Sequence, residues 1–175
     1  MTEQKEFDVF LCHNSLDKDS VSTIAEKLNK QDIVPWIDEG RIKGGDHWPS
    51  ILFDTINKTE IAFIFLGTNG IGNWQQMEID RLYINYTRSK KKNLKIVPVL
   101  LPGARNKDIP DQLQDFHSVT LENLEDNGGI GKLFEIFSKK DSKLDEGKKM
   151  TQNNNVSGNL YGNTQTGDIH QNFSR

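Results

Sequence analysis

Apolar residues fall into short runs and helix-spaced stripes that alternate from residue 7 to about residue 138. Residues 61–66, Ile-Ala-Phe-Ile-Phe-Leu, are apolar throughout, which predicts a fully buried strand. Residues 7–12 form a similar, mostly apolar run. Further strands are predicted at residues 33–37, 94–101 and 117–121. Pro35 favours an edge position for the second strand, and Pro98 interrupts the fourth.

The stripes between these runs have the spacing of amphipathic helices. Four apolar residues recur at i, i+3, i+4 and i+7 and share one helix face: Val21, Ile24, Ala25 and Leu28. Asp17 and Asp19 precede them as candidates for the N-cap and the first turn. Asn73 is the expected N-cap of a later helix, with Gln76 completing a capping-box-like pair. The other predicted helices cover residues 48–57, 74–88 and 130–137.

Strand–helix alternation with nearly continuous apolar strands predicts a parallel sheet covered on both faces. Five such units in this length suit an α/β fold with a flavodoxin-like, doubly wound, five-stranded parallel sheet. Sheets of this class bind ligands outside the carboxyl ends of their strands, beside the first strand. The loops of interest are therefore residues 12–19, 38–47 and 67–73.

Composition divides the 175 residues into three parts. Hydrophobic residues make up only 34% of the chain, and the deficit falls after residue 138. We therefore predict one domain over residues 6–138, a charged linker over 139–150 and a tail over 151–175. The tail holds six Asn, three Gln and three Gly but no Lys, which is too little apolar surface for a packed core.

Charge and cysteine content exclude several classes of protein. A net charge of −3 gives no overall attraction to nucleic acid or to an anionic membrane. Cys12 is the single cysteine, so no disulfide framework or Cys-rich zinc site is possible, and His13 has no second ligand at a suitable spacing. The first residues lack the apolar stretch of a signal peptide, and no apolar run approaches membrane-spanning length. These features predict a cytoplasmic protein without a metal or a membrane partner.

Three segments at the predicted carboxyl ends of strands carry recognisable motifs. Residues 7–15, Phe-Asp-Val-Phe-Leu-Cys-His-Asn-Ser, run from a strand into a loop that reaches Asp17. Residues 36–38, Trp-Ile-Asp, are followed by Gly-Gly-Asp-His-Trp at 44–48. Residues 67–78 end in the spacing Trp-x-x-x-Glu. In this order and spacing, over residues 6–138, the segments resemble the signature boxes of the Toll/interleukin-1 receptor (TIR) domain family.

The resemblance implies an enzyme that cleaves NAD, with Glu78 as the catalytic carboxylate. The Gly44-Gly45 pair resembles bacterial enzymatic members more than animal adaptors, which usually carry proline in this loop. The third box departs from the family pattern, because Phe116-His117 stands where Phe-Trp is common. The chain contains neither a P-loop nor a GxGxxG motif, so NAD is expected as a substrate and no cofactor is expected.

One carboxylate is enough for this chemistry. The nicotinamide ring of NAD is already cationic and leaves without a proton, so the usual carboxylate pair of glycosidases is not required. A carboxylate can hold the ribose hydroxyls and stabilise the positive transition state, giving nicotinamide and either ADP-ribose or a cyclic ADP-ribose. Helix geometry places Glu78 about 90° from the stripe of Ile79, Leu82, Tyr83 and Tyr86, at the edge of the buried face. From helix geometry alone, a surface acid favoured by the helix dipole is the simpler reading.

The other candidate residues each have a structural alternative. His13, Ser15, Asp38, Gly44, Gly45, Trp48 and Trp74 are the candidates for binding the substrate. Asp38 could equally cap its loop, the two glycines could form a turn, and Trp48 could pack in the core. Asp17, and less strongly Ser15, could cap the first helix.

The tail, in particular residues 155–173, resembles the short amyloid-signalling motifs of bacterial and fungal immune proteins. Low charge, no proline and many Asn and Gln residues favour cross-β stacking, and a functionless disordered tail is the alternative. The expected partners are NAD, further copies of the chain and a receptor with a similar C-terminal motif. Together these features predict an NAD glycohydrolase activated by self-assembly in bacterial immunity. A non-catalytic TIR adaptor is the main alternative, and a secreted protein that mimics host TIR domains fits the tail less well.

Overall fold

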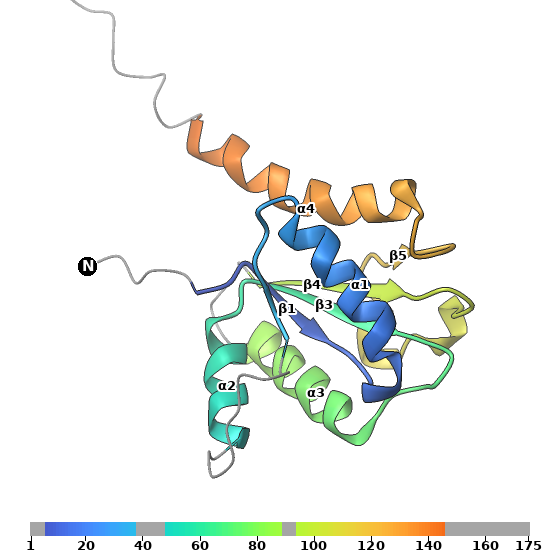
Figure 1. Cartoon of the computed structure of the whole chain (residues 1–175). Helices are drawn as coiled ribbons and strands as arrows, with labels where there is room; N and C mark the ends of the chain where they lie inside the picture. The colour runs from blue at the N-terminus through green and yellow to red at the C-terminus, as the bar shows by residue number, and fades with distance from the viewer. Residues whose placement is uncertain (1–5, 38–47, 89–93, 146–175) are drawn as a thin grey trace, which may run out of the picture.

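A computed structural model describes residues 6–37, 48–88 and 94–145. Strands and helices alternate along it, joined by three short 3-10 helices (Figure 1). The strands are β1 (Val9–Cys12), β2 (Pro35–Trp36), β3 (Ile61–Leu66), β4 (Lys95–Leu100) and β5 (Val119–Thr120). The α-helices are α1 (Lys18–Asn29), α2 (Trp48–Lys58), α3 (Asn73–Arg88) and α4 (Asn127–Asp145). The 3-10 helices are η1 (Ser15–Asp17), η2 (Asn106–Asp108) and η3 (Asp111–Leu113).

The strands form one parallel sheet in the order β2-β1-β3-β4-β5. This order confirms the predicted flavodoxin-like sheet, and β2 lies at an edge as Pro35 indicated. The expected interruption at Pro98 was wrong, because Pro98 pairs with Ile64 inside a continuous β4. The amides of Lys95 and Leu101 donate to β3, so the nitrogen of Pro98 faces β5, whose pairing starts only at Val99. Proline therefore costs no ladder hydrogen bond here.

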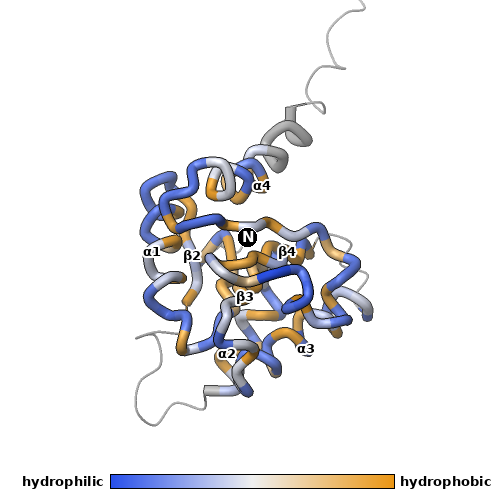
Figure 2. The backbone as a smooth tube through the Cα atoms, turned by 90° about the vertical axis from the view of Figure 1, so that its right-hand side faces the viewer, coloured by the Kyte–Doolittle hydropathy of each residue, from blue (hydrophilic) through white to orange (hydrophobic). Residues whose placement is uncertain are grey.

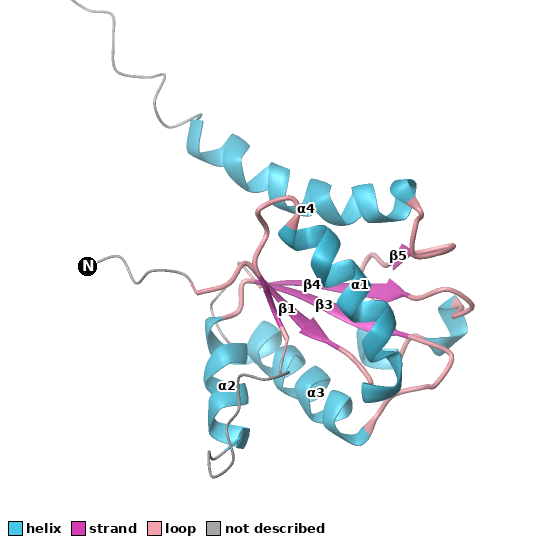
Figure 3. Ribbon diagram, in the orientation of Figure 1, coloured by secondary structure: helices cyan, strands magenta, loops and turns pink. Residues whose placement is uncertain are grey.

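Odd-numbered and even-numbered strand residues pack into two separate cores, one on each face of the sheet. Odd-numbered residues such as Val9, Phe63 and Val99 pack against α1 and α4. Even-numbered residues such as Phe10 and Ile64 pack against α2, α3 and the segment that contains η2 and η3. The ribbon shows α1 and α4 on one side of the magenta strands, with α2 and α3 on the other (Figure 3). Hydrophobic stretches accordingly run between the two helical layers (Figure 2).

Two helices differ from their predicted form. Helix α4 runs to Asp145, well past the predicted end at residue 137, so the segment predicted as a linker begins as helix. Helix α3 buries Gln75, Glu78, Ile79 and Leu82. Within the described ranges, no helix is long and apolar enough to span a membrane.

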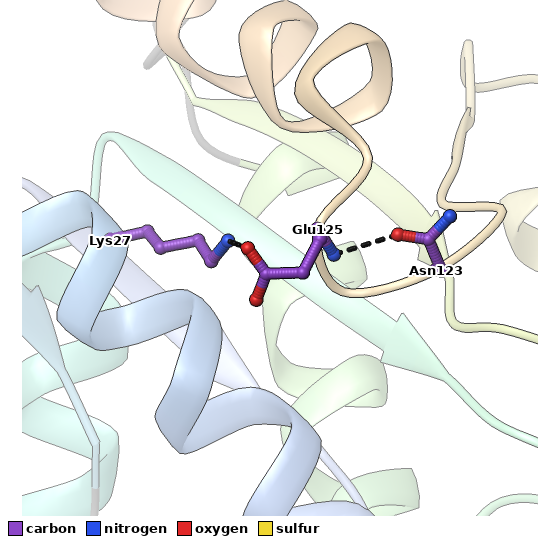
Figure 4. A network of polar contacts seen from close by, with 3 residues as sticks. All are labelled: Lys27, Asn123 and Glu125. Carbon is purple, nitrogen blue, oxygen red and sulfur yellow. Dashed lines mark hydrogen bonds and ion pairs between the residues drawn. The ribbon is translucent and has the colours of Figure 1, made fainter.

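A polar contact at the surface joins α1 to the segment before α4. The ammonium of Lys27 lies 2.8 Å from Oε2 of Glu125, and the Glu125 amide donates to Oδ1 of Asn123 at 2.8 Å (Figure 4). Because Glu125 is exposed, water screens this ion pair, and we assign it a stabilisation of at most about 1 kcal/mol.

Candidate functional site

The candidate site lies at the carboxyl ends of β1 and β3, where the strand order reverses. The chain passes from β1 to β2 on one side and returns with β3 on the other. Two loops meet at this point: residues 13–17 after β1 and residues 67–72 after β3. A doubly wound sheet presents its ligand crevice at such a switch point.

Two hydrogen bonds join the two loops. The side-chain amide of Asn14 donates to the carbonyl of Gly70 at 3.0 Å, and that of Asn69 donates to Oδ1 of Asp17 at 2.7 Å. Asn14 also accepts from the amide of Leu16 at 3.1 Å, which shapes η1. We call these four residues, Asn14, Asp17, Asn69 and Gly70, the loop clasp. The clasp holds the loops after β1 and β3 in a fixed relation.

Asp17 has a different role from the predicted cap. It occupies the N-cap position of α1 but makes no side-chain capping bond. Its carboxylate is buried against Gly67, where an added Cβ would lie 2.5 Å from both oxygens. Oδ2 has no hydrogen-bond partner in the described structure. Asp17 therefore serves the contact between the loops, and Gly67 is required by that close approach.

The start of α3 is capped by a residue pair other than the predicted one. Asn73 is the first helical residue, and the side chain of Gln76 bonds Asp80 instead of returning to Asn73. The Gly72 amide donates to Oε1 of Gln75 at 3.3 Å, which is the backward half of a capping box. The cap therefore lies one residue earlier than expected.

Glu78 is more deeply placed than helix geometry predicted. It is 5% exposed and belongs to the buried face of α3, which packs on β1. Tyr83 and Tyr86, which were expected in the buried stripe, are 36% and 47% exposed. The true stripe is rotated toward Gln75 and Glu78, so the expectation of an edge position was wrong. Glutamate is seldom fully buried, and Glu78 is the buried acid of α3, whereas Asp80 is exposed.

The structure brings some of the predicted binding residues to this edge of the sheet. His13 is half-buried directly after β1, and a ring nitrogen lies 3.3 Å from the carbonyl of Leu11. Ser15 is exposed at the start of η1, and Trp74 is 55% exposed in the first turn of α3. Trp48 is the first residue of α2. Asp38, Gly44 and Gly45 lie outside the described residues.

The degenerate third box lies away from this edge. Phe116 packs edge-on against Tyr86, with ring centroids 4.9 Å apart. Both residues, together with His117, border a hollow of about 440 Å³ between the start of β4, the segment before β5 and α4. The hollow faces the amino-terminal end of β4, so it is separate from the loop clasp and from Glu78.

Sequence reasoning missed three polar residues that build the site: Asn14, Asn69 and Gln75. Gln75 had a detectable signal, since it stands at i−4 and i−7 from Ile79 and Leu82 and so interrupts an apolar stripe with an amide. Asn14 and Asn69 had none, because each sits in a loop where Asn is common for local reasons.

The arrangement is suited to acting on a cationic group. A buried carboxylate one turn into α3 lies in surroundings where charge interactions are stronger than in water. Within the described residues, no group of three or more His, Cys, Asp or Glu side chains is placed to hold a metal ion. Besides the Asp17 carboxylate of the loop clasp and the ring of His13, this edge carries the carboxylate of Glu78, one helical turn after the exposed Trp74.

Comparison with known proteins gives one family. The family model described as the TIR domain matches residues 9–134. NAD(+) hydrolase TcpA from Theionarchaea archaeon (strain DG-70-1) is 29% identical over 121 residues, which cover 68% of this chain and 34% of that protein. The chain thus spans about a third of the length of this relative.

Solved structures share the fold at low sequence identity. The TIR domains of the activated Roq1 resistosome, which recognises the pathogen effector XopQ, give a TM-score of 0.56 at 19% identity, covering 77% of this chain and 99% of that one. A metazoan TIR-STING receptor from C. gigas in complex with 2',3'-cGAMP gives 0.62 at 16%, covering 79% and 41%. The TIR domain of the Toll-related receptor TRR-2 from Hydra magnipapillata gives 0.52 at 13%, covering 79% and 97%. At these identities the likeness concerns the fold alone.

Proposed function

Because this chain belongs to the TIR domain family, we propose that it cleaves the nicotinamide–ribose bond of NAD and that Glu78 is the catalytic carboxylate. The similarity to a protein named NAD(+) hydrolase supports this substrate. The single observation that carries the proposal is the burial of Glu78 at the carboxyl ends of β1 and β3, where doubly wound sheets bind ligands.

The reaction requires little from the protein beyond one negative charge. The bond between C1′ of the ribose and the nicotinamide nitrogen breaks, and its electron pair returns to the ring, which leaves neutral. Positive charge then develops on the ribose, where the Glu78 carboxylate stabilises it. Water adds to C1′ and loses a proton, giving ADP-ribose. Attack by the adenine of the same molecule would give a cyclic ADP-ribose instead.

The residues around Glu78 would hold the two ends of the substrate. Trp74 exposes its ring in the first turn of α3, and His13 and Ser15 lie in the loop after β1. Asp38, Gly44, Gly45 and Trp48 remain predictions for the same role.

We further propose that self-assembly activates the enzyme in the cytoplasm as part of bacterial immunity. Residues 151–175 would stack with the same segment of other copies or with a receptor that carries a similar motif. Assembly would raise the local concentration of TIR domains.

A synthetic peptide of residues 151–175 tests the assembly step. The composition predicts fibrils that bind thioflavin T and seed the full-length protein. A peptide with the same residues in scrambled order is the control for composition. Absence of fibrils at high concentration, even after seeding, would refute templated stacking.

A non-catalytic adaptor is the second candidate function. The observation in its favour is a set of apolar side chains exposed along α3, including Trp74, Met77 and Ile84. An adaptor would bind other TIR domains through such surfaces and leave NAD intact in every assembled state.

NAD consumption separates the two candidates. Full-length protein is measured in dilute solution and clustered on beads through an affinity tag, beside the Glu78→Ala variant. We expect NAD loss and stoichiometric nicotinamide release by the clustered wild type and neither by the variant. Equal turnover by the two proteins would refute the role of Glu78, and no turnover by the clustered wild type would favour the adaptor.

A further inference from the structure

The carbonyl of Phe65 lies where strands β1 and β3 separate. The carbonyls of Glu60 and Leu66 accept from the amides of Lys95 and Leu101, so even-numbered carbonyls at β3 face β4. The Phe65 carbonyl therefore faces β1. The β1–β3 ladder ends at the pair Cys12 and Ile64, so β1 has no paired residue beside Phe65. A buried carbonyl at such a position needs another donor.

The side chain of Gln75 supplies that donor. Its Nε2 donates to the Phe65 carbonyl at 2.6 Å, and its Oε1 accepts from the Gly72 amide at 3.3 Å. The Cys12 thiol donates to the main-chain carbonyl of Gln75 at 3.8 Å. Gln75 is 1% exposed. One residue thus contacts β1, β3 and the loop that leads into α3.

These contacts fix the part of the helix that carries Glu78. Glu78 follows Gln75 by three residues and shares its buried face. We infer that Gln75 is a positioning residue for the NAD cleavage proposed above, on which this inference rests. Its amide takes the place of the missing β1 partner and holds the first turn of α3, and with it Glu78, at the end of the sheet.

The contribution of Gln75 depends on both the Nε2 donor and the Oε1 acceptor of its side-chain amide. A leucine of similar size would fill the space but would leave the Phe65 carbonyl and the Gly72 amide without their partner. The first turn of α3 would then be free to shift along the sheet. A displacement of about 1 Å in a catalytic group can cost about 100-fold in rate.

Kinetics of Gln75→Leu test the inference against a matched control. The control is Gln76→Leu, since Gln76 is the next residue and bonds Asp80 at the surface. Clustered full-length proteins are compared at a temperature where circular dichroism finds each fully folded. We expect kcat of Gln75→Leu to fall about 10- to 100-fold with little change in KM for NAD. The reason is that a displaced Glu78 carboxylate stabilises the transition state less well. Gln76→Leu should stay within about twofold of wild type. A folded Gln75→Leu with wild-type kcat would overturn the inference.

A conservative variant adds a signature that loss of folded protein would not produce. In Gln75→Glu, a protonated carboxyl can still donate to the Phe65 carbonyl and accept from Gly72, whereas an ionised one cannot donate. The neighbouring titratable groups, Glu78 and the Cys12 thiol, are the same in both proteins. The kcat of the variant relative to wild type should therefore rise as pH falls, and a constant ratio would contradict the inference.

Hydrogen exchange separates failure of this inference from failure of the proposed function. In Gln75→Leu, amides 72–79 should exchange at least about tenfold faster than in wild type, while those of β3 and β4 keep their rates. Unchanged exchange at 72–79 would overturn the positioning role even without an activity assay. No turnover by the wild type would instead refute the proposed function, and the exchange result would still show whether Gln75 fixes this turn.

Discussion

At the end of β3, Gly67 faces a carboxylate that leaves no room for a side chain. An added Cβ would lie 2.5 Å from both oxygens of Asp17, whose Oδ2 lacks a partner among the described atoms. The fold therefore holds the Asp17 carboxylate in a crowded position against Gly67. In this position the Asp17 carboxylate accepts a hydrogen bond from Asn69, which joins the loops after β1 and β3.

Gly67→Ala should therefore destabilise the domain. The new methyl group must displace the Asp17 carboxylate, which we expect to lower the free energy of unfolding by about 1 to 3 kcal/mol. Urea unfolding followed by circular dichroism measures this difference.

A double-mutant cycle identifies the cause. In an Asp17→Ala background the carboxylate is absent, so Gly67→Ala should cost clearly less than it does alone. An equal cost in both backgrounds would show that the contact with the Asp17 carboxylate is not what makes glycine necessary.

Single residues were also where sequence reasoning was least complete. Asp17 was expected as a cap because aspartate before a helix usually is one, and its burial depends on Gly67, fifty residues away in sequence. Glu78 was proposed as the catalytic carboxylate through the family resemblance, but its burial was underestimated. The two tyrosines counted in its stripe were taken as buried, although they are 36% and 47% exposed.

At the scale of elements, a capping aspartate marks the start of α4. Helix α4 starts after Asp126, whose Oδ1 accepts from the Gly128 amide at 2.9 Å and whose Oδ2 accepts from the Glu122 amide at 3.3 Å. Hydrogen bonds from the backbone of Gly129, Glu122 and Gly128 lower the pKa of Asp126 below its usual value of 3.8. The charged form of Asp126 is thus favoured in the folded protein.

This lowered pKa predicts a pH-dependent contribution to stability. The folded-state pKa lies below the unfolded value, so the contribution is complete above the unfolded pKa and is lost as pH falls through the folded pKa. The difference in unfolding free energy between wild type and Asp126→Ser should be constant near neutral pH and shrink below about pH 4. Serine keeps a capping oxygen but does not titrate. A difference that stays the same from pH 7 to pH 3 would contradict this account.

Helices and strands could be predicted from the sequence where a short apolar pattern defines them. The runs at β1 and β3 and the stripe of α1 are unambiguous, because burial on a sheet or helix face fixes their period. The end of α4 was not predictable, since residues 139–145 lack an apolar stripe and their helix continues from a packed segment. The cap of α3 was misplaced by one residue because Gln75 and Gln76 are chemically identical, and only their orientation toward β3 distinguishes them.

At the scale of the whole molecule, the sheet order explains why the candidate site lies at β1 and β3. The two faces carry separate helical layers, and the chain changes face where β1 and β3 are neighbours. The sequence was sufficient to predict this architecture, because five apolar strands alternating with helices permit few arrangements. The loop clasp was not predictable, since its hydrogen bonds join segments more than fifty residues apart. Gln75 was detectable as an amide in an apolar stripe, but its hydrogen bond to the unpaired end of β3 was not.

The central claim is that cleavage of NAD by this chain depends on the negative charge of Glu78. The most direct test is nicotinamide release by clustered full-length protein carrying Glu78→Gln, a neutral side chain of nearly the same shape. The control is Glu26→Gln, an exposed acid on α1 at the opposite face of the sheet. We predict that Glu78→Gln loses about 100-fold or more in kcat while it stays folded, and that Glu26→Gln retains wild-type activity. Wild-type turnover by Glu78→Gln would contradict the claim and show that the reaction does not depend on this carboxylate.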